Sequence, residues 1–336
     1  NPDILNEHYI PPNIPGREAQ ITELQECLSP ALKRKKPIHS WLFGKPGTGK
    51  TLIATYILNK IKREANVLGV YINCWEYNSY YSVLDKIVRE LRILGAEKLN
   101  SAFKMERLTK FIGSMPFVIV LDEIDQPNPK EREAILYNLS AVGSTGLVCI
   151  CNSRYILMTM DERIKSRLSL KQIEFLPYSD QDLIFILEQR ANFALHPDSW
   201  NRKILRKIAE IAEGDARIAI QTLKNSAYNA DNDYSQKIKD KHIESGYNSA
   251  KVIKKTYLLN KLTTHHRILY DLVRENKEIE SGKLWKIYLE KCKERNKQPI
   301  ALRTFSEYMN KLIELDLVQW DRALKRGKVR VFKVSG

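Results

Sequence analysis

The chain has 336 residues, of which 43% are hydrophobic and 28% are charged. This length suits two or three domains of roughly 150 residues each, and the hydrophobic content excludes a disordered chain. The longest apolar runs, Phe117–Leu121 and Gly146–Cys151, are far shorter than the ~20 residues of a membrane-spanning helix, so we expect no membrane partner. The polar start Asn1-Pro2-Asp3 does not resemble a secretory signal, and the missing initiator methionine indicates a fragment.

Lys and Arg outnumber Asp and Glu by 55 to 40, which gives a net charge of +15. Residues 251–336 hold 21 basic and 10 acidic residues and so carry +11 of this charge. Such a basic region favours a polyanionic partner, although a solvated surface without function has the same composition. The five cysteines are an odd, dispersed set, which favours reduced intracellular thiols over a disulfide framework or a zinc site.

Short apolar runs alternate with amphipathic segments in the first half of the chain. The expected strands are residues 40–43, 67–72, 117–121 and 147–151, and the expected helices are residues 51–63 and 82–94. The continuous apolar runs are typical of parallel strands that are covered on both faces. Alternating strands and helices predict an α/β fold.

Helical patterns dominate after about Ile173. We expect helices at residues 179–192, 199–212 and 217–228, followed by a polar connection over residues 229–245 with room for a short helix. A compact basic domain is expected from about Thr256.

Residues 44–51 match the phosphate-binding pattern G-x-x-x-x-G-K-T and lie between an expected strand and an expected helix. Backbone N–H groups of such a loop surround phosphate oxygens, and the helix N-terminus adds its dipole. Lys50 is expected to reach the β- and γ-phosphates, and Thr51 to bind Mg²⁺. The remaining loop residues assigned to the nucleotide are Gly47, Thr48 and Gly49. The alternative is a glycine-rich loop that matches by chance.

The apolar run Phe117–Leu121 ends in two carboxylates, Asp122 and Glu123. Asp122 is placed to hold the Mg²⁺ shell, and Glu123 to orient and deprotonate the water that attacks the γ-phosphate. The alternative is that Asp122 and Glu123 are solvated loop residues without function. The phosphate-binding loop upstream argues against this alternative.

The sequence Asp122-Glu123-Ile124-Asp125 resembles the Walker B motif of AAA+ ATPases. This resemblance implies that Asn152, after the next strand, is a polar sensor and that Arg217 in Gly214-Asp215-Ala216-Arg217 is the sensor 2 arginine. It also implies that Arg167, with Arg163 as second choice, is an arginine finger for a neighbour's nucleotide. Turn and surface roles are the alternatives.

Asn73, at the end of the second expected strand, resembles the polar residue that restrains the Walker B glutamate in many AAA+ proteins. A turn residue at a strand end is an equal alternative.

These motifs, the segment Pro11–Arg17 and the basic C-terminal region together resemble archaeal initiators of the origin recognition complex and cell-division-cycle-six type. The resemblance covers nearly the whole chain. It implies an AAA+ P-loop core with a parallel sheet over residues 1–174, a helical lid and linker over 175–250, and a winged-helix domain over 251–336. It further implies that Tyr178 and Arg190 lie near the nucleotide, with a helix cap and an exposed arginine as alternatives.

The same family inserts a helical element that contacts DNA after the second strand. Tyr80 and Tyr81 lie at the corresponding place, in an aromatic segment before the helix expected from Ser82. Their rings could wedge into a minor groove. Capping the core is an equally good interpretation of either ring.

The last 80 residues show three amphipathic helices and a hairpin, the pattern of a winged helix. In the third helix Phe305, Met309, Leu312 and Ile313 form one apolar stripe, so the polar residues between them face outward. The outward residues assigned to DNA are Arg303, Thr304, Ser306, Asn310 and Lys311, and those of the basic wing are Arg322, Lys325, Arg326 and Lys328. A protein-docking module is the alternative.

The resemblance therefore implies a cytoplasmic, nucleoid-associated replication initiator that binds ATP or ADP with Mg²⁺ and double-stranded origin DNA. Paralogous initiator subunits and the replicative helicase are the expected partners. Hydrolysis is expected to be slow in an isolated chain, because AAA+ sites take an arginine from a neighbour. The alternatives are an AAA+ remodelling, clamp-loading or signalling ATPase, and a nucleotide-regulated protein-docking scaffold.

Overall fold

The computed structural model describes residues 1–336 except 7–8, 66, 97–98, 153–154, 323–329 and 336. The chain divides into two compact units, Asn1–Ser249 and Ala250–Gly336. Each unit has its own sheet and its own set of buried hydrophobic side chains. Among the described residues, no helix is long and apolar enough to cross a membrane. All five cysteines are buried free thiols.

A parallel five-stranded sheet forms the centre of the first unit, in the order β2-β3-β4-β1-β5. The strands are β1 (Ser40–Gly44), β2 (Leu68–Asn73), β3 (Phe117–Asp122), β4 (Thr145–Cys151) and β5 (Lys171–Phe175). Every residue of β3 and β4 is buried, as expected for continuous apolar runs that are covered on both faces. The predicted α/β fold with a parallel sheet is therefore confirmed.

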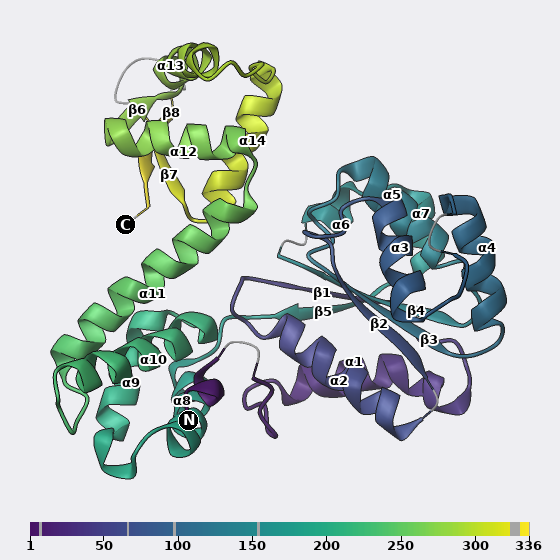
Figure 1. Ribbon diagram of the computed structural model, residues 1–336, viewed down its shortest axis with the longest axis horizontal. Helices are drawn as coiled ribbons and strands as arrows, with labels where there is room; N and C mark the ends of the chain where they lie inside the picture. Colours follow the sequence, from purple (N-terminus) through teal and green to yellow (C-terminus); the bar gives the residue numbers. More distant parts are fainter. Residues whose placement is uncertain (7–8, 66, 97–98, 153–154, 323–329, 336) are drawn as a thin grey trace. The chain divides into compact units, whose positions relative to one another are not determined.

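Helices cover both faces of this sheet (Figure 1). Leu42 and Val120 face one layer, which consists of α1 (Glu18–Leu28) and α2 (Lys50–Glu64). Trp41 and Leu121, their neighbours in sequence, face the other layer, because side chains alternate along a strand. That second layer contains α3 (Tyr80–Glu90), α4 (Ser101–Ile112), α5 (Pro129–Leu139), α6 (Tyr155–Thr159) and α7 (Glu162–Leu168).

The lid of the first unit is helical. It contains α8 (Asp180–Ala194), α9 (Arg202–Ala212) and α10 (Ala216–Asn232), and α11 (Asp240–Lys261) begins after it. Ser179 and Asp182 form a capping box at the start of α8, and Asp215 caps α10. The short 3-10 helix η1 (Pro2–Leu5) packs on this lid, with Leu5 in its hydrophobic core.

The predicted polar connection over residues 229–245 differs from the structure, because α10 continues to Asn232 and the 22-residue helix α11 starts at Asp240. Side-chain hydrogen bonds stabilise the turn between them. The buried ring of His242 accepts from the backbone N–H of Lys239 at 3.0 Å through Nδ1 and pairs with Asp233 through Nε2. Apolar periodicity carries no signal for such contacts.

In the part of the second unit that the structure describes, the end of α11 is followed by three further helices and a three-stranded antiparallel sheet in the order β6-β8-β7. These elements are α12 (Thr264–Asn276), β6 (Glu278–Glu280), α13 (Ser281–Glu294), α14 (Leu302–Glu314), β7 (Val318–Arg322) and β8 (Arg330–Val334). This is the topology of a winged helix, and only the short strand β6 was absent from the sequence-based expectation.

Candidate nucleotide site and nucleic-acid interface

The phosphate-binding loop connects β1 to α2 and depends on three glycines. Gly44, Gly47 and Gly49 have φ angles of +149°, +77° and +89°, a range that side chains with a Cβ rarely adopt. The resulting turn ends at Lys50, the first residue of α2, so the N-terminus of that helix opens toward the loop. Backbone donors and a helix dipole therefore converge where the sequence predicts phosphate binding.

Lys50 is almost fully buried, at 6% exposure, and its Nζ donates to the carbonyl oxygens of Gly44 and Lys45, at 2.8 Å each. Burial lowers the pKa of Lys50 to about 8, and the positive charge of Arg217 acts in the same direction against the carboxylates of Asp122 and Asp125. A phosphate beside Lys50 would favour its charged form. The positive charge of the predicted sensor 2 arginine is thus felt at the predicted lysine.

Oxygen donors meet at the carboxylate of Asp122, which is 5% exposed. Its Oδ2 accepts from Thr51 Oγ1 at 2.8 Å and from the hydroxyl of Tyr71 at 2.7 Å. One carboxylate and one hydroxyl fit Mg²⁺, which keeps several waters and usually binds with the substrate phosphates. Among the described residues, no group of three or more His, Cys, Asp and Glu could hold a metal ion by itself. Tyr71 was missed by the sequence reasoning.

Glu123 follows Asp122 directly and has a left-handed backbone, with φ +53°. Its N–H donates to Asp122 Oδ1 at 2.9 Å, which fixes the two residues relative to each other. This conformation costs a residue with a Cβ on the order of 1 kcal/mol, and such strain gathers at functional sites. The turn therefore suits a residue that is positioned for chemistry.

Asn152 and Asn73 lie at the carboxyl edge of the sheet. Asn152 follows β4, which pairs with β1 on one side and β3 on the other, so it stands between the phosphate loop and Asp122. Asn73 pairs in register with Asp122, but its Oδ1 accepts from the N–H of Trp75 at 2.9 Å. Asn73 thus caps a turn, which was the second of its two interpretations.

The lid contacts the phosphate loop at two of its three glycines, Gly47 and Gly49. The N–H of Ala216 donates to the carbonyl of Gly47 at 3.1 Å, and Asp215 Oδ1 caps α10 by accepting from Arg217 N at 2.9 Å. The hydroxyl of Tyr178 would lie 2.6 Å from a Cβ placed on Gly49. The structure therefore brings Tyr178 and the start of α10 directly onto the phosphate loop.

Arg17 connects this lid to the phosphate loop, a role that the sequence reasoning did not assign. Its Nε donates to Thr48 O at 3.0 Å, and its Nη2 to Leu176 O at 2.6 Å. The guanidinium stacks on Tyr178, 3.6 Å from the ring centroid. Burial lowers the pKa of Arg17, and the neighbouring Tyr178 and Asp182 act against that shift. In the sequence, the segment Pro11–Arg17 was the only feature that could have pointed to this role of Arg17.

Arg190 has partners that the sequence did not predict. Its guanidinium donates to the carbonyls of Ile4, Asn6 and Tyr9 and lies 4.7 Å from the centroid of the Tyr9 ring. The contacts thus go to the N-terminal segment, and a direct contact with nucleotide stays a prediction.

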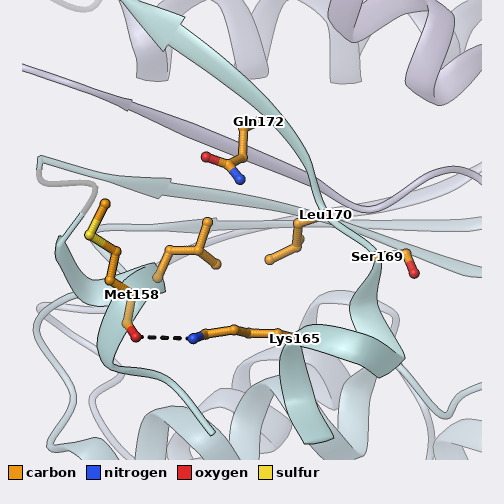
Figure 2. A pocket seen from close by; sticks show the side chains of 6 residues that line it. Met158, Lys165, Ser169, Leu170 and Gln172 are labelled. Carbon is orange, nitrogen blue, oxygen red and sulfur yellow. Dashed lines mark hydrogen bonds between the residues drawn. The ribbon is translucent and has the colours of Figure 1, made fainter. Parts of the chain in front are cut away.

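Both candidate arginine fingers are exposed on α7. Arg167 stacks over the ring of Tyr137 from α5, at 4.4 Å from the centroid. A cavity of about 370 Å³ lies beside this helix, and Lys165 Nζ donates to Met158 O at 3.0 Å at its rim (Figure 2). Its lining residues are Leu157, Met158, Lys165, Ser169, Leu170 and Gln172. A second cavity, of about 680 Å³, lies between residues 12–16 and α8.

The two tyrosines at the start of α3 differ in burial. Tyr80 packs against the sheet core, and burial raises its pKa, so its ring caps the core. Tyr81 is 46% exposed, and the ammonium of the fully buried Lys104, which pairs with Asp85, lies 4.2 Å from its ring centroid. Contact of either ring with DNA stays a prediction.

Helix α14 presents the predicted outer face. Phe305, Met309 and Leu312 are buried, and Ile313 is half-buried. On the opposite face Arg303, Ser306 and Asn310 are exposed, and Thr304 and Lys311 are half-buried.

Contacts on this face link α14 to the sheet of the second unit. Asn310 Oδ1 accepts from Arg330 Nη1 at 3.1 Å, and that guanidinium lies 4.7 Å from a ring centroid of Trp320. Of the predicted wing, Lys325, Arg326 and Lys328 lie outside the described residues, and Arg322 ends β7 with a side chain that is not described.

Comparisons with known proteins agree with this geometry. Residues 13–150 match the model of an AAA ATPase domain, and residues 184–248 that of a Cdc6 AAA+ ATPase-type lid domain. The ORC1-type DNA replication protein 9 of Halobacterium salinarum is 28% identical over 323 residues, which cover 94% of this chain and 89% of the relative. The solved structure of the Aeropyrum pernix ORC1 protein in complex with DNA is 26% identical, with a TM-score of 0.82, and covers 100% of this chain and 93% of that chain.

The ORC1-type DNA replication protein 1 of Halobacterium salinarum is 30% identical over 292 residues, which cover 85% of this chain and 93% of the relative. Together with the matching AAA domain and lid, this similarity over nearly the whole relative shows that the chain belongs to the ORC1-type DNA replication proteins.

Proposed function

We propose that the chain is a replication initiator that binds origin duplex DNA through its winged helix and through the start of α3, with bound ATP or ADP as the switch. The observation that carries this proposal is the lid closed on the phosphate loop, where Ala216 and Tyr178 meet Gly47 and Gly49. A lid in this position would respond to a nucleotide that binds in the phosphate loop. The A. pernix relative, whose structure is a complex with DNA, supports the choice of ligand.

In the proposed site the backbone of residues 47–49 and the side chain of Lys50 bind the phosphates. Thr51 and Asp122 would hold Mg²⁺, which supplies charge neutralisation at the phosphates when it is bound. Glu123 would accept a proton from the attacking water, Asn152 would orient that water, and Arg217 would stabilise negative charge.

Slow turnover is proposed on the ground that Arg167 would serve a neighbouring subunit. Arg167 is exposed on α7, where it could reach a neighbour's nucleotide, and hydrolysis would then wait for assembly. The proposed neighbours are paralogous initiators, and the replicative helicase is the proposed downstream partner. ATP would then act mainly as a conformational switch.

DNA binding is proposed for the exposed face of α14 and for the basic wing. Arginine and asparagine side chains on one helix face are suited to base edges, and lysines to phosphates. The net charge of residues 251–336, with 21 basic and 10 acidic residues, supplies attraction to a duplex.

The testing experiment measures duplex origin DNA affinity at about 0.1 M salt for the protein without nucleotide, with ADP and with a non-hydrolysable ATP analogue, alongside the ATP turnover rate. We expect tight binding that differs between the two nucleotides, with slow turnover. Fast DNA-stimulated turnover would favour a motor or clamp-loading ATPase instead. Failure to bind duplex DNA would favour the protein-docking scaffold.

A further inference from the structure

Residues 2–6 and Tyr9 of the N-terminal segment contact the lid, and we call these described residues the strap. Its anchor is Leu5, which is 3% exposed and lies in one hydrophobic cluster with Leu187 and Ala191 of α8 and with Leu223 of α10. Lys224 of α10 adds a polar contact, because its Nζ donates to Asn6 Oδ1 at 2.6 Å. Two lid helices thus hold the same short segment.

Arg190 contacts the strap with a buried positive charge, which needs hydrogen-bond partners. The side chain is 4% exposed, and its guanidinium bonds the carbonyls of Ile4, Asn6 and Tyr9. Burial lowers the pKa of Arg190 to about 10, so the group stays charged at neutral pH. A buried cation is costly unless hydrogen bonds replace its hydration, and here carbonyls of the strap accept from Nη1 and Nη2 of Arg190.

The other end of the same stretch of chain reaches the nucleotide site. Beyond Tyr9 the chain runs through Pro11 to Arg17, whose guanidinium bonds Thr48 O in the phosphate loop and stacks on Tyr178 at the start of the lid. The strap therefore contacts the lid, and Arg17, further along the same chain segment, contacts the phosphate loop.

We propose that Arg190 and Lys224 are positioning residues for nucleotide binding. They hold the strap on the lid, so that lid closure over the phosphate loop and the placement of residues 11–17 become one coupled event. Coupling of this kind is reciprocal, so a nucleotide in the loop also tightens the strap on the lid. The inference rests on the proposed function, because it assumes that the phosphate loop binds nucleotide.

The test uses the full chain and measures ADP affinity by titration calorimetry, together with hydrogen exchange of the strap amides with and without ADP. Arg190→Met removes the guanidinium and keeps the side-chain length. Leu5→Asp expels the strap and leaves Arg190 unchanged. We expect each change to weaken ADP binding about tenfold, a typical coupling between sites, and the double variant to lose little more.

Further variants separate positioning from general damage to the lid. Arg190→Lys is expected to recover part of the affinity, since an ammonium still binds carbonyls without the planar fork. Arg206→Met changes an exposed arginine of α9 and is expected to keep parental affinity. In the parent protein ADP is expected to slow exchange in the strap, and in Arg190→Met this protection is expected to be lost.

Two results would overturn the inference. If Arg190→Met weakens ADP binding while Leu5→Asp keeps parental affinity, Arg190 contacts the nucleotide itself. If both variants bind ADP like the parent, the strap has no part in binding. A parent chain that binds no ADP would overturn the proposed function first and the inference with it, so the two failures are distinguishable.

Discussion

The carboxylate of Asp215 lies directly against Gly47 of the phosphate loop, so that a Cβ added to Gly47 would stand 1.9 Å from Asp215 Oδ1. Asp215 also caps α10 by accepting from the backbone N–H groups of Arg217 and Ile218. Gly47 therefore has two roles, because it shapes the phosphate loop and also contacts the lid.

Gly47→Ala is expected to push the lid off the phosphate loop and to reduce ADP affinity. Gly95→Ala is the matched control, because Gly95 has φ +73° against +77° for Gly47 but has no atom within 4 Å of its added Cβ. Both changes cost about 1 kcal/mol of backbone strain. Titration with ADP checks the prediction, and equal affinity of the two variants would contradict it.

Nucleotide binding is expected to take up protons near pH 8. The pKa of Lys50 is about 8 because of burial, and a bound phosphate raises it by favouring the charged ammonium. As the pH rises through this pKa the free protein loses the proton, so affinity falls by up to about tenfold per pH unit. Below about pH 7 the affinity stays nearly constant, since Lys50 is charged in both states.

Calorimetry of ADP binding in buffers with different ionisation enthalpies measures this uptake. Lys45→Met, which removes an exposed loop lysine, is expected to keep the pH dependence. An affinity that stays constant from neutral to alkaline pH would show that Lys50 is already fully charged in the free protein.

Glu123→Gln is expected to slow ATP hydrolysis by at least about a hundredfold, the usual contribution of a general base. Binding of ATP is expected to persist, because the strained turn and its hydrogen bond to Asp122 involve only the backbone of Glu123. Single-turnover release of phosphate is the measurement, with the exposed Glu106→Gln as control. If Glu123→Gln hydrolysed ATP at the parental rate, the general base would have to be another residue.

The nucleotide site could be predicted in part from the sequence. The residues of the phosphate loop and of the acidic strand end are local patterns, and the parallel sheet places them together at one edge. Tyr71, Arg17 and Asp215 were missed because their roles come from contacts between segments distant in sequence. No spacing in the chain reports that Tyr71 shares Asp122 with Thr51.

In the lid, too, contacts between distant segments could not be predicted from the sequence. Periodicity predicted three lid helices, but α11 has buried polar contacts in place of a clear apolar stripe, so its length was not predicted. The strap contacts of Arg190 could not be predicted either, since the backbone carbonyls of Ile4, Asn6 and Tyr9 have no sequence signature. In α14, by contrast, the apolar stripe alone indicated which residues face outward.

Single changes on α14 are expected to separate base reading from phosphate contact. Asn310→Ala should relax sequence preference by about 1–3 kcal/mol at one base pair, because the amide is suited to a base edge. Lys311→Ala should weaken binding to all sequences and reduce the salt slope by about 1. Affinities for origin and scrambled duplexes over a salt series check both. A uniform loss in Asn310→Ala would mean that it contacts only the backbone.

The most direct test of a DNA-binding initiator is footprinting of origin duplex DNA with two charge-reversed proteins. One carries Arg303→Glu with Lys311→Glu on α14, and the other carries Arg274→Glu with Lys277→Glu at the end of α12. Both lower the net charge equally, so only the location differs. We predict that the α14 pair loses the footprint, with affinity down by about a hundredfold, while the α12 pair keeps it. Equal footprints for the two proteins would contradict the account.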